Sequence, residues 1–138
     1  MTDAIRNEQP DICIFLGDGE RDLRAIEEKF PKLPVYAVRG NCDFTTALES
    51  SFVRTFSGVT VFASHGHRAN VKYEYGYETL TSQAVQAGAN IALFGHTHQQ
   101  HLSYSSGVML LNPGAAHYRD YAVLIMENGK YEAELKTI

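Results

Sequence analysis

A strand, a helix and a second strand follow one another in ICIFLGDGERDLRAIEEKFPKLPVYAVRGNCD (residues 12–43). The apolar, β-branched run Ile12–Leu16 is typical of a short buried strand. Residues Glu20–Phe30 predict a helix, because their apolar members form one stripe and charged residues cover the rest. Val35–Val38 predicts the next strand. This β-α-β order implies that the two strands pair in parallel, which indicates an α/β fold.

Beyond this unit, most of the predicted strands lie in hairpins with short glycine-containing turns. A two-sheet α/β sandwich accommodates both the parallel unit and the hairpins. The expected elements are a hairpin on Ser57-Gly58, a helix over Tyr77–Gly88, a buried strand Ile91–Phe94, two strands around Ser106-Gly107, and a final hairpin on Asn128-Gly129.

Length and composition exclude several classes of protein. The 138 residues predict a single domain, 1–138, without internal linkers. Twelve basic and 16 acidic residues give a net charge of −4, which argues against nucleic acid or an anionic membrane as a bulk partner. No apolar run reaches the roughly 18 residues that span a bilayer, and no apolar leader segment is expected. The two cysteines, Cys13 and Cys42, exclude a disulfide framework and predict a reducing, cytoplasmic location.

Polar residues follow four of the predicted strands at their carboxyl ends. Ligands bind outside this edge of a parallel sheet, so these side chains are expected to converge. Asp, Asn and His offer oxygen and nitrogen ligands without a thiolate set, which suits Mn²⁺, Fe or Zn²⁺ at a catalytic site. The four segments are Gly17-Asp18, Gly40-Asn41-Cys42-Asp43, His65-Gly66-His67 and Gly95-His96-Thr97-His98.

Each segment also has a structural interpretation. Asp18 could cap the helix that follows it, and Gly40–Asp43 could be an ordinary turn. The histidines of His65–His67 could simply lie in a loop. The segment Gly95–His98 favours a functional site, because two histidines two positions apart after a buried strand rarely serve packing. The four segments together therefore favour a site over four separate structural roles.

In order and spacing, these segments resemble those of the calcineurin-like metallophosphoesterases. Cys42 in the second segment and the later Leu111-Asn112-Pro113-Gly114 look like the small phosphodiesterase branch of the family, the YfcE type. The resemblance covers nearly the whole chain. It implies a two-sheet αββα sandwich of the metallo-dependent phosphatase type, with two divalent transition metals at the strand ends. Mn²⁺ is the metal expected, and Zn²⁺, Fe and Ni²⁺ are the alternatives.

The resemblance also assigns metal ligands. It implies that Asp18 bridges the two metals and that Asn41, His65 and His96 complete the second metal site. His98 would belong to the first metal site.

The same resemblance assigns the catalytic residues Asn41 and His67, which would contact phosphate oxygens. It implies that a metal-bound hydroxide attacks phosphorus and that the alcohol leaves. Larger relatives carry a histidine where Cys42 stands, and that histidine helps to protonate the leaving group. Its absence favours diesters or good leaving groups as substrates. Arg68 and Arg119 could also contact phosphate, although solvated surface positions are more common for such residues.

One departure concerns the start of the chain. The family begins with a strand carrying Asp-x-His, which supplies two ligands to the first metal, and this chain has no Asp-x-His. Residues 1–11 look like the end of the helix that normally follows that strand, so the domain is expected to be N-terminally shortened by about 20–25 residues. Asp11 cannot substitute, because it lies roughly 20 Å from Asp18 along the strand.

The sequence therefore predicts an intact second metal site and an impaired first one that keeps only Asp18 and His98. It also predicts an open edge on the strand Ile12–Leu16, with a homo-oligomer covering the gap. The expected function is that of a metal-dependent phosphoesterase, specifically a phosphodiesterase, acting on a small phosphate ester. The alternative is a non-catalytic scaffold or binding module with a degraded first metal site, as in the retromer subunit of this fold.

Overall fold

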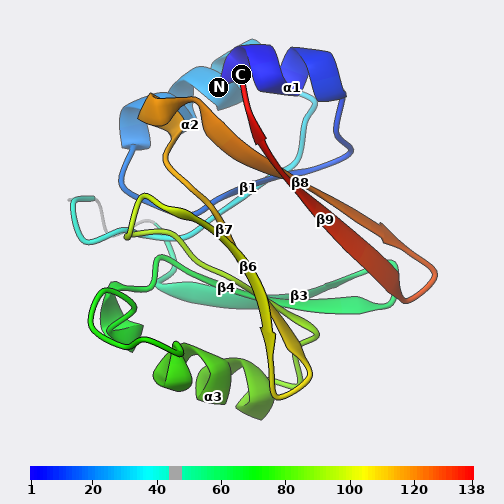
Figure 1. Ribbon diagram of the computed structural model, residues 1–138. Coiled ribbons are helices and arrows are strands. Elements are labelled where there is room, and N and C mark those ends of the chain that lie inside the picture. Colours follow the sequence, from blue (N-terminus) through cyan, green and yellow to red (C-terminus); the bar gives the residue numbers. More distant parts are fainter. Residues whose placement is uncertain (44–47) are drawn as a thin grey trace.

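Two layers of strands lie between helices (Figure 1). The structure is a computed structural model that describes residues 1–43 and 48–138. Its helices are α1 (Thr2–Glu8), α2 (Glu20–Lys29) and α3 (Glu78–Gln86), with short 3-10 turns η1 (His67–Ala69) and η2 (Ala116–Tyr118). Its strands are β1 (Cys13–Phe15), β2 (Val35–Ala37), β3 (Ser51–Phe56), β4 (Val59–Ser64), β5 (Ile91–Leu93), β6 (Gln100–Ser105), β7 (Val108–Pro113), β8 (Asp120–Glu127) and β9 (Lys130–Thr137).

The larger layer is a five-stranded sheet in the order β3-β4-β5-β7-β6. Its three central strands run parallel, and antiparallel hairpins add β3 and β6 at the edges. The hairpins turn at Ser57-Gly58 and Ser106-Gly107, where both residues of each pair have positive φ. Such two-residue turns match the twist of the flanking strands. The predicted hairpins are therefore confirmed, including the last one, on Asn128-Gly129.

The second layer consists of two separate pairs of strands. β1 and β2 pair in parallel, as the β-α-β order predicts, and β8 and β9 form an antiparallel hairpin. Within the described residues, no ladder joins the two pairs. The sequence predicted a buried strand here, but β1 is half-buried. The reason is that, within the described residues, β1 has a neighbouring strand on one side only. That a second copy of the chain covers its other edge stays a prediction.

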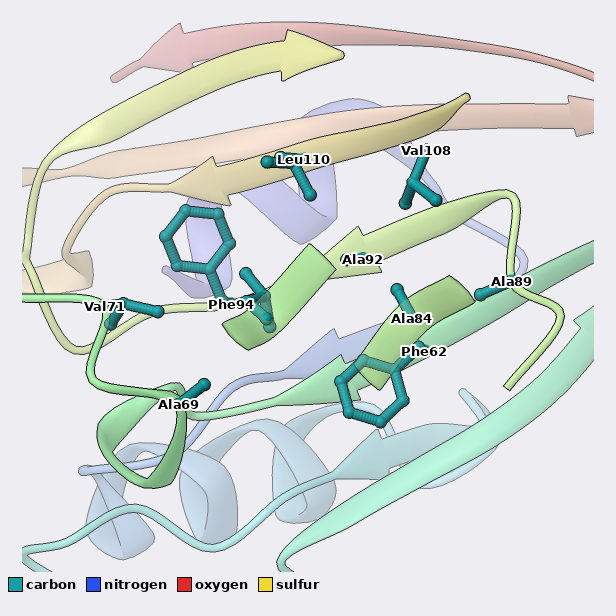
Figure 2. Packing of buried hydrophobic residues seen from close by; sticks show 10 residues of the cluster. Phe62, Ala69, Val71, Ala84, Ala89, Ala92, Phe94, Val108 and Leu110 are labelled. Carbon is teal, nitrogen blue, oxygen red and sulfur yellow. The ribbon is translucent and has the colours of Figure 1, made fainter. Parts of the chain in front are cut away.

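Two apolar clusters hold these layers together. Between the layers, side chains of the five-stranded sheet such as Val61, Leu93 and Leu111 pack against side chains of both strand pairs. On the outer face of the sheet, α3 and η1 cover a second cluster that includes Phe62 and Phe94 (Figure 2). The order of layers is thus helix, strand pairs, five-stranded sheet and helix, which is the arrangement expected of an αββα sandwich.

The first helix is attached to the last hairpin by polar contacts. The Glu8 carboxylate accepts hydrogen bonds from the Tyr121 hydroxyl and the Lys136 ammonium, both at 2.8 Å. These bonds lower the pKa of Glu8 and raise the pKa values of Lys136 and Tyr121. The contact joins residues 128 positions apart in the sequence, and so it fixes α1 over the second layer.

Candidate metal centre

Three of the predicted metal ligands converge where strands of both layers end. Asp18 follows β1, His65 follows β4, and His96 follows β5. The Nε2 atom of His65 lies 3.1 Å from Asp18 Oδ2 and 3.1 Å from His96 Nδ1. The ligand atoms of the three residues all lie within 4.8 Å of one another. The strand-end pattern therefore predicted correctly that these three side chains converge, and that they bind a metal stays a prediction.

Hydrogen bonding of His65 sets up this cluster for a cation. The Nδ1 atom of His65 lies 2.7 Å from the carbonyl oxygen of Leu16, which can only accept, so Nδ1 carries a proton. In the neutral ring, Nε2 then presents a lone pair to the carboxylate of Asp18 and to the ring nitrogen of His96. Facing lone pairs repel unless a proton or a metal ion lies among them. One carboxylate and two imidazoles are donors that suit a divalent transition metal, so these residues fit the metal that the family resemblance implies.

His96 is held in the protonation state that binds metals. Burial lowers its pKa to about 4, and the charges of His65 and Lys72 act in the same direction. The ring is therefore neutral at pH 7. A neutral imidazole can bind a metal without first releasing a proton.

Asp43, to which the sequence assigned no role, joins the loops after β1 and β2. Its carboxylate is 5% exposed and accepts hydrogen bonds from the backbone N–H groups of Gly40 (2.7 Å), Asp18 (2.9 Å) and Gly19 (3.2 Å). Burial alone would raise the pKa of Asp43, but these three donors together hold it below its ordinary value. Asp43 therefore acts as a fixed anion that positions the backbone of Asp18.

Two glycines allow the same loops to approach closely. A Cβ atom at Gly40 would collide with the backbone nitrogen and carboxylate of Asp18. A Cβ atom at Gly17 would lie 2.6 Å from the nitrogen of Gly40, and Gly17 also has a φ of 98°. The other Asp18 oxygen, Oδ1, accepts a 2.7 Å hydrogen bond from the N–H of Cys42. Asp18 makes no capping bond to α2, whose N-cap is Gly19, so the capping interpretation is wrong.

Asn112 holds the loop that carries His96 and also had no role in the sequence interpretation. Its side chain is fully buried and donates to the carbonyl of Gly95 (3.1 Å) and to Thr97 Oγ1 (3.0 Å). Its oxygen accepts from the N–H of Gly114 at 2.9 Å. The loop needs this support because His96 has a φ of 67°, in the left-handed region that costs a non-glycine residue energy.

His98 does not join the cluster of converging carboxylate and imidazole groups. Asn41 is exposed in the loop after β2, and in residues 1–43 and 48–138 it makes no side-chain hydrogen bond. His98 is exposed too, and its ring packs edge-on against His117 at 5.4 Å between centroids. The structure thus brings together three of the four predicted carboxylate and imidazole ligands. The role of Asn41 in the second metal site and that of His98 in the first stay predictions.

Three cations act on the histidines of the site, beside the carboxylates of Asp18 and Asp43, although the whole chain is acidic. The ring of His67, the predicted phosphate contact, lies 5.4 Å from that of His65, and its Nδ1 atom is buried without a hydrogen-bond partner among the described residues. Burial lowers the pKa of His67, and the nearby charges of His65, Arg68 and Arg39 lower it further. Lys72 acts on His96 in the same way. Within the described chain, Arg39, Arg68 and Lys72 form no ion pair, so they give the site a local field that attracts anions.

Comparisons with known proteins agree with this fold. Residues 1–128 match the calcineurin-like phosphoesterase superfamily domain, so the chain belongs to this family. It is 31% identical over 139 residues to the probable metallophosphoesterase YsnB of Bacillus subtilis, covering 93% of this chain and 76% of that protein.

Solved structures show the same architecture. A predicted phosphoesterase from Streptococcus pneumoniae superposes with a TM-score of 0.80 at 21% identity, over 98% of this chain and 79% of that one. Vps29 from Entamoeba histolytica, in a complex with Zn²⁺, superposes with a TM-score of 0.66 at 20% identity, over 85% of this chain and 76% of that one. At these identities the likeness shows the fold alone.

Proposed function

We propose that the protein hydrolyses phosphate esters, phosphodiesters in particular, with a bound divalent transition metal. The observation that carries this proposal is the convergence of Asp18, His65 and His96 at the strand ends. Family membership supports phosphoester chemistry. Mn²⁺ is the metal we propose first, since the donors are oxygen and nitrogen without thiolate, and Zn²⁺, Fe and Ni²⁺ accept similar donors.

The three residues would hold the metal through Asp18 Oδ2, His65 Nε2 and His96 Nδ1. A divalent metal in such a site neutralises phosphate charge and lowers the pKa of water. In the overall reaction, the oxygen of water bonds to phosphorus, the bond from phosphorus to the ester oxygen breaks, and that oxygen takes a proton. His67 and the cations Arg39 and Lys72 would bind and orient the phosphate group. Asn41, exposed in the loop after β2, would add a further contact to phosphate.

The choice of diesters rests on Cys42. This exposed cysteine follows Asn41, at the place where the resemblance gives larger relatives a proton-donating histidine. A thiol is a poor replacement for an imidazole as a general acid near pH 7. Substrates whose leaving group departs without strong protonation are therefore favoured. Diesters with good leaving groups meet this requirement.

The second candidate function is that of a non-catalytic scaffold or binding module. The observation in its favour is that His98 lies apart from the three converging residues and packs on His117. This position of His98 supports the expectation that the first metal site is impaired. The argument against the scaffold function is that a module without metal chemistry gains nothing from three lone-pair donors that converge beside cationic side chains.

A direct test is Mn²⁺-dependent hydrolysis of bis(p-nitrophenyl) phosphate. We expect metal-dependent turnover, and a loss of about 100-fold or more in kcat/KM for His96→Ala, because a metal ligand is removed. His101→Ala is the matched control, since His101 bonds to Ser103 on β6, away from the cluster, and activity should change less than about threefold. A folded chain without metal-dependent turnover, or equal losses in both variants, would contradict the proposal.

We further propose that the protein works in the cytoplasm. Both cysteines are free thiols, which fits a reducing compartment. Among the helices of the described residues, none has the length and apolar character needed to cross a membrane.

A further inference from the structure

A cavity of about 430 Å³ opens beside the histidine cluster. It lies between the segment that follows β4 and the C-terminal half of α3, with the start of β3 at its margin. His65 and His67 form the wall nearest to the metal centre. Phe62 and Ala69, seen in the apolar cluster of Figure 2, supply its apolar part. The volume is within the range of pockets that bind small molecules.

Two buried polar atoms at this cavity have no hydrogen-bond partner. Ser64 lines the cavity and is 9% exposed, and its Oγ atom has no hydrogen-bond partner in residues 1–43 and 48–138. The Nδ1 atom of His67 is also buried without a hydrogen-bond partner in the described residues. Buried polar groups are nearly always satisfied, so an unpaired hydroxyl and an unpaired ring nitrogen at one cavity indicate a place for a ligand's polar atoms.

The remaining polar lining defines the chemistry of that ligand. Hydroxyls and amides surround the cavity, and Arg68 adds one guanidinium, which forms no ion pair in the described parts of the chain. None of the lining residues is acidic. Such a wall favours a group with several hydroxyls and a negative charge, and it rejects a cation. The polar residues are Ser50, Ser51, Ser64, Arg68, Gln83 and Gln86.

We propose that this cavity receives the ester group that stays on phosphorus during hydrolysis and selects a phosphorylated sugar there. This inference rests on the proposed phosphoesterase function and names the substrate class of that site. The phosphate diester would lie at the histidines, with the sugar hydroxyls at Ser64 and the glutamine amides. The second anionic group of the sugar would pair with Arg68.

Binding can be tested without turnover, with ribose 5-phosphate as the probe. The metal-free, ¹⁵N-labelled chain is titrated at pH 7 with ribose 5-phosphate, ribose and inorganic phosphate in parallel. We expect ribose 5-phosphate to bind at least tenfold more tightly than either of the others. The shifted amide signals should belong to residues 64–69 and 83–87. Arg68→Met should raise the Kd at least tenfold, whereas Arg24→Met, on the exposed side of α2, should leave it unchanged.

Equal affinity for inorganic phosphate and ribose 5-phosphate would overturn the inference, because the anion would then bind at the histidines alone. An unchanged Kd in Arg68→Met would also overturn the inference, and so would amide signal shifts that are confined to α2. Ser64→Ala removes only a hydroxyl and should raise the Kd about threefold or more, which keeps the test valid if Arg68→Met is unstable. The binding assay needs neither metal nor turnover, so its failure would not contradict the proposed hydrolysis of aryl diesters. A failure of aryl diester hydrolysis, in turn, would not contradict the binding of ribose 5-phosphate.

Discussion

Replacing Asp43 with Asn tests how the two loops are joined beneath the metal centre. Asn has the shape of Asp, so the substitution removes charge while it preserves packing. One oxygen of Asp43 accepts from Gly40 and Asp18, and the other accepts from Gly19. In the Asp43→Asn chain, the amide oxygen can keep the first two bonds, but the NH₂ group of the new side chain then faces the N–H of Gly19.

The cost follows from these bonds. Each of the two retained bonds loses its ionic character, at about 1 kcal/mol each, and an unsatisfied N–H at Gly19 adds about 1 kcal/mol. Asp43→Asn should therefore lower the free energy of unfolding by about 3 kcal/mol at pH 7. Because folding depresses the pKa of Asp43, this stability is present above the unfolded pKa of about 3.9. It is lost as the pH falls through the folded-state pKa, so the difference from the wild type should shrink there.

Urea unfolding followed by tyrosine fluorescence measures this difference, since the chain has eight tyrosines and no tryptophan. Asp22→Asn is the matched control. Asp22 is exposed in the first turn of α2, so this change should cost about 0.5 kcal/mol. An Asp43→Asn chain within about 0.5 kcal/mol of the wild type at pH 7 would refute the reasoning.

Three further substitutions test other parts of the account. Gly40→Ala should weaken Mn²⁺ binding about 10–100-fold, because the new Cβ would displace Asp18. Gly95→Ala is the control and should change the affinity little, since its Cβ would lie 3.6 Å from its nearest neighbour. Equal Mn²⁺ affinities of the two variants in calorimetry would contradict the role given to Gly40. Asn112→Leu should lower the free energy of unfolding by about 2–4 kcal/mol, because it leaves buried polar groups without partners. An unchanged midpoint in urea unfolding would show that the loop does not need Asn112. Glu8→Gln should lower the thermal midpoint at pH 7. Since folding depresses the pKa of Glu8, the difference should shrink as the pH falls through the folded-state pKa, and a difference that stays the same throughout an acid titration would exclude this explanation.

Local signals predicted most of the fold. The turns at Ser57-Gly58, Ser106-Gly107 and Asn128-Gly129 carry their own conformational preference, so their hairpins follow from the sequence alone. The parallel pairing of β1 and β2 follows from the helix between them. The burial of β1 could not be predicted in this way, because it depends on which strands lie beside it.

The site was predictable only where a pattern along the chain marked it. Asp18, His65 and His96 each follow a strand, and parallel strands bring their ends together. Asp43 and Asn112 act by satisfying backbone groups of distant loops, and no spacing in the sequence reveals which donors lack a partner. The cations beside the site were hidden as well, because a net charge of −4 says nothing about where the charges lie.

The most direct test of the central claim is anomalous diffraction from crystals of the chain grown with Mn²⁺. The account predicts a peak among Asp18 Oδ2, His65 Nε2 and His96 Nδ1, and its loss in crystals of His96→Ala. A peak elsewhere, or none at saturating Mn²⁺, would contradict the claim that these three residues form a metal centre.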